Sequence, residues 1–224
     1  MGFGNIGIGD RLCIIISEVI KMDYAVFDIE ISRTIGQVAK ELGLIDEKEA
    51  FSYPHKLGFS VGVIYNSKTG EFLVFNSAKE MAKYLLDFDG LLVSFNGVRF
   101  DIPCLLNSCD IDTFLALQQK KHLDLLADFY KNVNGKFRVS LNNIAEITLK
   151  KKKSGNGADA PILFQQGKMD ELIEYCKNDV MLTKEIFEFG CQFGYIYYFD
   201  RQKGEMDEMS ALYLDWLEDE KDVD

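Results

Sequence analysis

Two runs rich in β-branched and aromatic residues, joined by a short turn, constrain the fold more than any other feature. They form KLGFSVGVIYNSKTGEFLVF, residues 56–75, in which NSKTG supplies Asn, Ser and Gly, residue types that turns prefer. This pattern predicts an antiparallel β-hairpin. An earlier apolar run, from Tyr24 to about Ile29, predicts another strand. The first three strands are therefore expected to be sequential and antiparallel.

Strand and helix signals alternate after the hairpin. The segment SAKEMAKYLLD, 77–87, begins with Ser77 as a candidate N-cap and has Glu80 three residues later, so it predicts a helix. The run LLVSF, 91–95, predicts a buried strand. We also expect a helix around residues 36–44, a helix at 140–149 and a long helix from about 169 to 189. This order predicts an α/β domain whose mixed sheet has antiparallel strands first, then parallel strands, flanked by helices.

Charge and cysteine content limit the class of protein. Thirty-six acidic residues against 25 Lys and Arg give a net charge of −11, so a nucleic acid would need local positive patches or bridging cations. Five cysteines without a CxxC pair argue against a disulfide framework and a zinc knuckle. We expect a cytoplasmic protein with no membrane partner. We predict an extension at 1–22, one domain at 23–199, and a strand, turn and acidic tail at 200–224.

The run YAVFDIE ends in two acids one residue apart, Asp28 and Glu30. Because side chains alternate along a strand, both carboxylates project from one face and share one volume. Like charges held together raise the pKa of at least one group unless a cation neutralises them. A hard divalent metal is the natural partner for such a pair. An exposed acidic strand end is the alternative interpretation.

Two later segments carry further candidate functional residues. In NGVRFDIP, Asp101 stands where a strand gives way to a helix, an edge where catalytic groups concentrate. In YCKNDVMLTKEIF, Tyr175 and Asp179 are four residues apart on an amphipathic helix, so both point the same way. Each residue also has an ordinary interpretation, as a helix cap, a core aromatic or a solvated acid.

Taken in order, FDIE, SFNGVRFDIPCLL and YCKNDVMLT resemble the three motifs of the DEDD 3′-5′ exonucleases. The Tyr-x3-Asp form of the third motif marks the DEDDy branch. The motif sequences are most similar to those of the exonuclease domains of B-family DNA polymerases and of stand-alone relatives. The resemblance covers roughly residues 23–199. The chain departs from the commonest first motif by carrying Ile31 where Thr often follows the Glu.

The resemblance implies a ribonuclease-H-like fold in which four carboxylates hold two Mg²⁺ or Mn²⁺ ions. By this resemblance Asp28 bridges both ions, Glu30 and Asp179 complete one site, and Asp101 serves the other. Such a pair of ions assists an in-line displacement at a phosphodiester.

Other residues are expected to contact the attacking water or the substrate. The resemblance gives Tyr175 the role of positioning the attacking water, and a pKa near ~10 makes a tyrosine a poor base at neutral pH. Asn96 and Phe100 match motif residues near the terminal nucleotide of the substrate. A run of four lysines precedes a glycine-rich loop, and we predict that Lys151 and Lys152 bind the nucleic-acid backbone. A solvated helix end is an equal alternative for these lysines.

Other candidate residues are expected to be structural. Asp124, in HLDL, is not needed once the four-acid set is complete. His55 and His122 lie outside the third motif and are expected to be structural or surface residues. The aromatic run FGYIYYF, 193–199, alternates like a strand and is expected to lie mainly in the core.

We therefore expect a metal-dependent exonuclease that hydrolyses phosphodiester bonds at the 3′ end of a single-stranded or otherwise 3′-ended nucleic acid. Two alternatives stay open: a catalytically idle nucleic-acid-binding module, and an endonuclease or trimmer of short oligonucleotides. A like-charged cluster is costly to keep without metal, which argues against the idle module. DNA and RNA both stay open as substrates. The protein would act alone or through a protein partner at its extension or tail.

Overall fold

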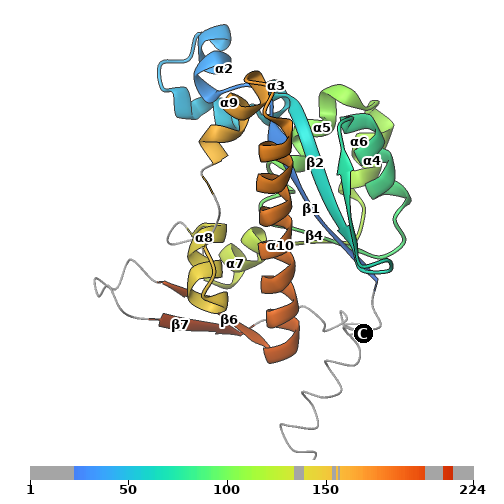
Figure 1. Ribbon diagram of the computed structural model, residues 1–224, viewed down its shortest axis with the longest axis vertical. Coiled ribbons are helices and arrows are strands. Elements are labelled where there is room, and N and C mark those ends of the chain that lie inside the picture. Colours follow the sequence, from blue (N-terminus) through green and yellow to red (C-terminus); the bar gives the residue numbers. More distant parts are fainter. Residues whose placement is uncertain (1–22, 134–138, 153–154, 156, 200–208, 214–224) are drawn as a thin grey trace, which may run out of the picture.

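A five-stranded mixed sheet with the order β3-β2-β1-β4-β5 organises the fold (Figure 1). The computed structural model describes residues 23–133, 139–152, 155 and 157–199, and the backbone of 209–213. Neighbouring strands β3, β2 and β1 are antiparallel, whereas β4 runs parallel to both β1 and β5. The predicted mixed sheet is therefore confirmed. Its strands are β1 (Tyr24–Ile31), β2 (Phe59–Asn66), β3 (Glu71–Phe75), β4 (Leu91–Ser94) and β5 (His122–Asp124).

Strand β1 lies at the centre of the sheet, with β2 along one edge and β4 along the other. Every residue of β1 is buried except Asp28, which is half-buried. A strand with partners on both edges and helices on both faces needs an almost continuous apolar sequence, which explains YAVF. The register with β2 shifts between Glu30 and Ile31, a β-bulge of the kind that re-aims side chains beside functional sites.

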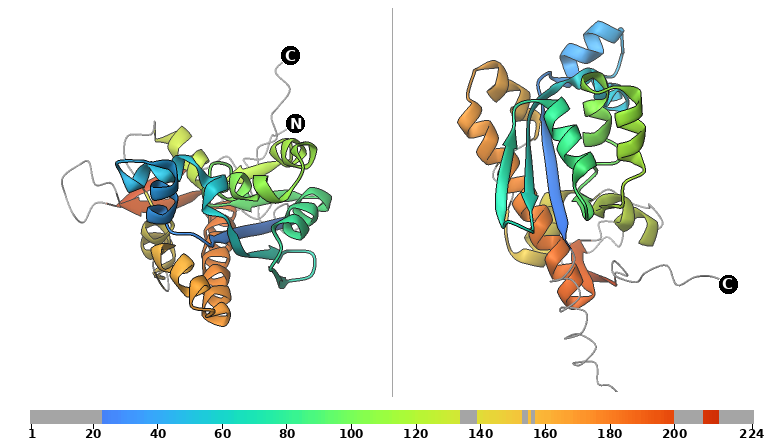
Figure 2. Two further views of the ribbon diagram at one scale, coloured as in Figure 1. Left: turned by 90° about the horizontal axis from the view of Figure 1, so that it is seen from above. Right: turned by 90° about the vertical axis from the view of Figure 1, so that its right-hand side faces the viewer.

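Helices cover both faces of the sheet, as the edge-on view in Figure 2 shows. Because side chains alternate along a strand, Val26 packs in one core with the longest helix, whereas Phe27 packs in a second core on the other face. The first layer comprises α7 (Leu125–Asn132), α8 (Leu141–Ile144) and α10 (Met169–Phe193). The second comprises α4 (Ala78–Asp87), α5 (Asp101–Leu105) and α6 (Ile111–Gln118).

Local signals explain where several helices begin and end. The Ser77 hydroxyl accepts the Glu80 N–H at 3.3 Å, which confirms the predicted N-cap of α4. Helix α10 runs past the predicted end near residue 189 and stops at Gly194, whose φ of 74° suits glycine. The helix expected at 140–149 divides into α8 and a π-helical turn, η3 (Ala145–Leu149).

The segment between β1 and β2, residues 32–58, folds into a small helical unit that we call the inserted segment. It contains α2 (Ile35–Leu42), a 3₁₀ turn η1 (Glu47–Ser52) and α3 (Pro54–Leu57). Only one helix, near residues 36–44, is expected there from sequence, so η1 and α3 are additions. Thr34 and Gln37 form a capping box at the start of α2.

The remaining elements connect the layers or form a separate sheet. They are η2 (Leu106–Ser108), η4 (Gly157–Asp159), α9 (Ala160–Gln165) and the antiparallel pair β6 (Tyr195–Phe199) and β7 (Met209–Tyr213). The extension predicted at 1–22 and most of the predicted tail lie outside the described residues. In the described part of the chain, no helix combines the length and apolarity needed to cross a membrane.

Candidate active site

The end of β1 places two carboxylates in one volume. Asp28 pairs with Val63 of β2 and Glu30 with Val61, so the two acids occupy alternate positions on the same face. One oxygen of each carboxylate and the Sγ of Cys176 lie within 4.8 Å of one another. Glu30 is only 6% exposed, which excludes the simple interpretation of a solvated acidic strand end for this residue.

Asp101 joins these acids from the first turn of α5. Its Oδ1 accepts the backbone N–H of Ile29, between the two β1 acids, at 3.0 Å. Helix α5 has no side-chain N-cap, so Asp101 binds the sheet rather than capping its own helix. The pKa of Asp101 is raised to about 7, chiefly because burial disfavours the charged form. The hydrogen bond from Ile29 opposes this shift, and the nearby charges of Asp124 and Asp179 contribute to it.

Helix α10 brings Tyr175 and Asp179 to the same place. The helix packs against β1 and β2, and Cys176 Sγ lies 3.6 Å from Asp28 Oδ2. Asp179 is only 3% exposed and Tyr175 only 7%, so this carboxylate is not the solvated helix acid of the ordinary interpretation. The spacing of four residues places both side chains on the helix face that meets the sheet.

These side chains line one cleft with a volume of about 370 Å³. The structure brings together seven of the nine residues predicted from sequence: Asp28, Glu30, Asp101, Tyr175 and Asp179, with Asn96 and Phe100. Among the described residues that line the cleft, none is Lys, Arg or His. The four carboxylates therefore line one cleft, an arrangement that fits a hard divalent cation held by oxygen ligands.

The loop before α5 is held by Asp124. Asp124 accepts the backbone N–H of Asn96 at 2.8 Å and that of Val98 at 3.0 Å, and it also caps α7. Asn96 has a φ of 74°, a left-handed conformation that is uncommon for residues other than glycine. Asp124 thus has the structural role expected for it, and it holds a strained residue at the cleft.

His122 is also a structural residue, as expected from the sequence. His122 Nε2 and Ser94 Oγ are hydrogen-bonded at 2.8 Å between neighbouring strands. Burial lowers the pKa of His122 to about 4, so its ring is neutral at physiological pH. His122 does not line the cleft.

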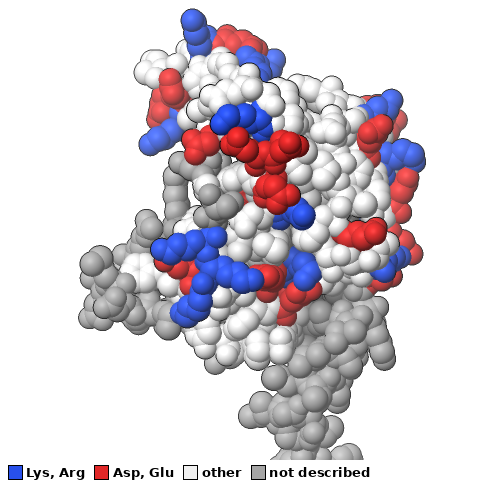
Figure 3. Space-filling model, in the orientation of Figure 1, with Lys and Arg blue, Asp and Glu red and all other residues white. Residues whose placement is uncertain are grey.

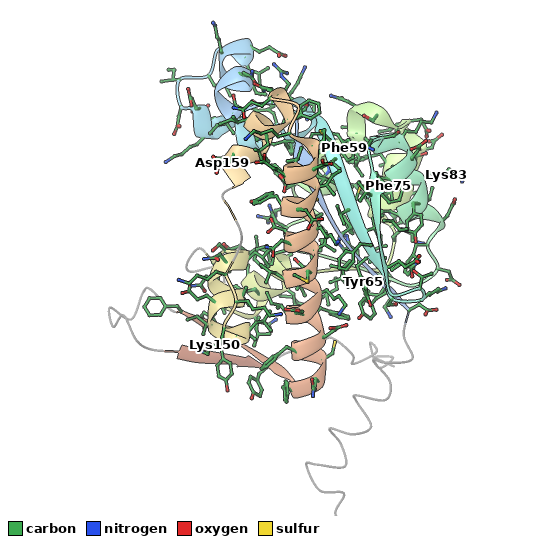
Figure 4. The ribbon with its side chains drawn as sticks, in the orientation of Figure 1. Phe59, Tyr65, Phe75, Lys83, Lys150 and Asp159 are labelled. Atoms are coloured by element: carbon green, nitrogen blue, oxygen red, sulfur yellow. The ribbon has the colours of Figure 1, made fainter. Side chains whose placement is uncertain are left out.

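The two predicted substrate-binding lysines lie outside the cleft. Lys151 Nζ forms an ion pair with Glu185 at 2.6 Å, and Lys152 Nζ pairs with Glu146 at 3.2 Å. Figure 3 shows Lys and Arg side chains gathered over this part of the surface, and Figure 4 places Lys150 beside the C-terminal sheet. The structure therefore separates the lysine run from the seven residues that meet in the cleft.

Two parts of the cleft wall are not predicted from the sequence. Thr34, Ile35 and Phe51 come from the inserted segment, Gly157 comes from η4, and Pro161 comes from α9. No local sequence pattern identifies these residues as part of the cleft. Their position depends on how the inserted segment and α9 pack against the rest of the domain.

Gly155 and Gly157 lie against the side chain of Tyr175. A Cβ added at Gly155 would lie 3.0 Å from Tyr175 Cε2, and one at Gly157 would lie 3.6 Å from Tyr175 Oη. Gly155 therefore packs directly on the ring, where the contact leaves little room for a side chain.

One comparison with known proteins gives a family. The family model described as RNase_H superfamily matches residues 27–189, which is more than half of the chain. The match begins in β1 and ends in α10, so it includes all seven converging residues. No curated protein matches the chain.

Proposed function

Since the chain belongs to the RNase_H superfamily, we propose that it is a metal-dependent 3′-5′ exonuclease of the DEDDy type. The substrate in this proposal is the 3′ end of a nucleic acid, and the reaction is hydrolysis of its terminal phosphodiester bond. The observation that carries the proposal is the convergence of four carboxylates and a tyrosine in one cleft.

Four residues would hold the divalent ions: Asp28, Glu30, Asp101 and Asp179. When bound, two such ions lower the pKa of a water molecule and stabilise charge on both the entering and the leaving oxygens. Burial of Glu30, Asp101 and Asp179 supports this assignment, because charged carboxylates are costly to hold together in a buried site without a cation. Mg²⁺ and Mn²⁺ are the proposed ions, since both prefer oxygen ligands.

Tyr175 would orient the attacking water. Its ring is buried one helical turn before Asp179 and packs against Gly155, so its position is restrained. A phenol is a poor base near neutral pH but a good hydrogen-bond donor and acceptor. The hydroxyl can therefore aim a water molecule without removing its proton.

The test uses single strands labelled at either the 3′ or the 5′ end, with Mg²⁺ or Mn²⁺, and compares the wild type with Asp28→Ala and Asp179→Ala. We expect the 5′-labelled strand to give a ladder that shortens from the 3′ end, with no ladder from either variant. Activity that persists in both variants would eliminate the proposed centre. Internal cuts would indicate an endonuclease, and binding without cleavage would indicate an idle module.

A further inference from the structure

The aromatic run FGYIYYF, which contains β6, is divided between two faces. The sequence predicts that this run lies mainly in the core, but within it only Ile196 and Tyr198 are buried. Because side chains alternate along a strand, Tyr195, Tyr197 and Phe199 share the opposite face of β6, where all three are half-buried. One face of the strand therefore packs on the core, and the other presents aromatic rings.

Rings from the end of α10 continue this face into a row. The ring centroids are 4.5 Å apart for Phe189 and Phe193, and 6.3 Å apart for Phe193 and Tyr195. Those of Tyr195 and Tyr197 are 5.0 Å apart. All three distances lie in the range in which aromatic rings touch. We call these four residues the aromatic row.

The row is fixed to the segment that precedes the lysine run. The Thr148 hydroxyl of η3 donates to the carbonyl oxygen of Tyr197 at 2.7 Å and accepts the N–H of the same residue at 2.9 Å. The side-chain oxygen of Asn143, on α8, accepts the N–H of Phe199 at 3.3 Å. The turn η3 is π-helical, a conformation that recurs at functional sites. A surface held this way loses little conformational entropy when it binds a ligand.

The lysine run lies between the aromatic row and the cleft. Lys150, which follows η3 directly, has a φ of 58°, and Lys151 pairs with Glu185 of α10. Along that helix, Glu185 stands between Tyr175 and the aromatic row. The segment that begins with these exposed lysines then reaches Gly155, which packs on the Tyr175 ring. Positive charge therefore adjoins both the aromatic row and the tyrosine of the cleft.

We propose that the aromatic row and Lys150–Lys152 form an exosite, which binds the part of a single-stranded nucleic acid that lies 5′ of the end held in the cleft. This proposal rests on the proposed exonuclease function and adds a second binding surface for the same substrate. Lysines attract backbone phosphates, and aromatic rings stack on bases of any identity. Strand β6 lies beyond residues 27–189, which the family model matches, so the exosite would be an addition to the shared domain.

The length of α10 sets the length of strand that the exosite needs. Phe193 lies 18 residues after Tyr175 on this helix. At a rise of ~1.5 Å per residue, the two are about 27 Å apart along the axis. A strand with stacked bases advances ~3.4 Å per nucleotide, so about eight nucleotides connect the cleft with the aromatic row. A trinucleotide can occupy the cleft but cannot reach the row.

The first test compares KM on strands of three and of twelve nucleotides, in a thymidine and a uridine series. The double variant Tyr195→Leu, Tyr197→Leu removes two π-faces but keeps apolar bulk. Tyr53→Leu is the matched control, because Tyr53 is 39% exposed and lies outside both the cleft and the aromatic row. We expect the wild-type KM to be at least about tenfold lower for the longer strand. That ratio should fall to about two in the double variant and stay unchanged in the control.

Three outcomes of this test decide the proposal. The double variant Tyr195→Phe, Tyr197→Phe should restore the wild-type ratio, because it keeps both rings, and a ratio that stays low would overturn stacking. A wild-type KM that is equal for the two strand lengths would overturn the exosite. A ratio unchanged by the leucine double variant would overturn it as well.

A binding measurement separates the exosite from the exonuclease function. A twelve-nucleotide strand with fluorescein at its 5′ end is titrated with protein in EDTA, where no metal-dependent hydrolysis proceeds, and its anisotropy gives Kd. The leucine double variant should bind about tenfold more weakly than the wild type and the Tyr53→Leu control. Equal Kd values in all three proteins would refute the exosite even if the exonuclease function holds. The expected binding pattern without any cleavage by the wild type in Mg²⁺ or Mn²⁺ would refute only the exonuclease function.

Photo-crosslinking tests the same contact in the wild-type protein, so it does not depend on how a variant folds. Twelve-nucleotide strands carry one 5-iodouracil, at either the second or the eighth nucleotide from the 3′ end, and crosslinked peptides are mapped by mass spectrometry. We expect the eighth nucleotide to crosslink to the peptide that contains Tyr195 and Tyr197, and the second nucleotide not to do so. The same pattern from both positions would overturn the proposed path of the strand.

Discussion

The acidic cleft and the lysine run differ in how their predicted residues are used by the fold. The four acids come from β1, α5 and α10, elements far apart in sequence, yet all line one cleft. Lys151 and Lys152 are adjacent in sequence, yet each pairs with an acid of the protein itself, outside that cleft. Residues carried by the central strand and its packing helices are confined by the core, whereas exposed lysines take whichever partner is near.

The difference separates two kinds of sequence evidence. Acids at defined positions on a strand or helix have a fixed direction, and burial then makes their proximity costly unless it serves a function. A run of lysines has no fixed direction, and exposed ion pairs contribute little free energy, so the same side chains can exchange partners. We therefore expect changes in the cleft to have large effects on activity and changes in the lysine run to have small ones.

The largest effect should come from Glu30→Gln. The amide keeps the shape of the side chain but removes the charge that would hold a cation, so we expect kcat to fall at least about a hundredfold. The matched control is Glu146→Gln, which removes the partner of Lys152 and should leave kcat within about twofold. The measurement is kcat for hydrolysis at the 3′ end. An equal loss of kcat in the two variants would contradict the expected difference between the cleft and the lysine run.

Metal-linked stability should be the next largest effect. Burial raises the pKa of Asp101 from 3.8 to about 7, so between these values the folded state keeps a proton that the unfolded chain has lost. The stability of the metal-free protein should therefore fall as the pH rises through this window. Mn²⁺ should restore it, raising Tm by about 5–10 °C at pH 8 when present at about a hundred times its Kd.

The same thermal measurement at pH 5 should give a smaller shift, because the proton on Asp101 competes with the metal. Asp101→Asn is the control, and it should lose most of the difference in metal-free stability between the two pH values. A Tm shift with Mn²⁺ that is the same at both pH values would contradict the assignment of Asp101 as a metal-holding residue.

Tyr175→Phe should have a moderate effect. Removing the hydroxyl deletes one hydrogen bond to the attacking water but keeps the buried ring, so kcat should fall about tenfold while KM stays unchanged. Stopped-time assays over a range of substrate concentrations separate the two constants. Parallel changes in kcat and KM would count against a role in orienting water.

The smallest effect should come from Lys151→Ala combined with Lys152→Ala. We expect KM to rise about two- to threefold and the dependence of log KM on log salt to become shallower by about 0.7 for each lysine that contacts a phosphate. Lys83→Ala is the matched control: its side chain is 75% exposed, as is that of Lys152, and it also pairs with an acid. Figure 4 shows Lys83 and Lys150 on opposite sides of the molecule. An unchanged salt dependence in the double variant would remove the lysine run from the substrate-binding surface.

Much of the fold could be predicted because its signals are local. The hairpin of β2 and β3, the Ser77 cap and the long helix α10 each depend on spacing within one segment. Short elements such as η1 and α3 escaped prediction because a single turn carries no periodicity and depends on packing. Strand β1 and helix α10 both extend a few residues beyond the ends expected from the sequence. Tertiary contacts extend an element past the residues that carry its local signal.

The sequence by itself determined directions within elements: Asp28 and Glu30 share a strand face, and Tyr175 and Asp179 share a helix face. The tertiary structure alone decided the distances between elements, including the bond from Ile29 to Asp101 and the placing of Phe51 at the cleft. The physical reason is that backbone geometry sets where a side chain points over a few residues. What it meets there depends on how separate layers pack around the core.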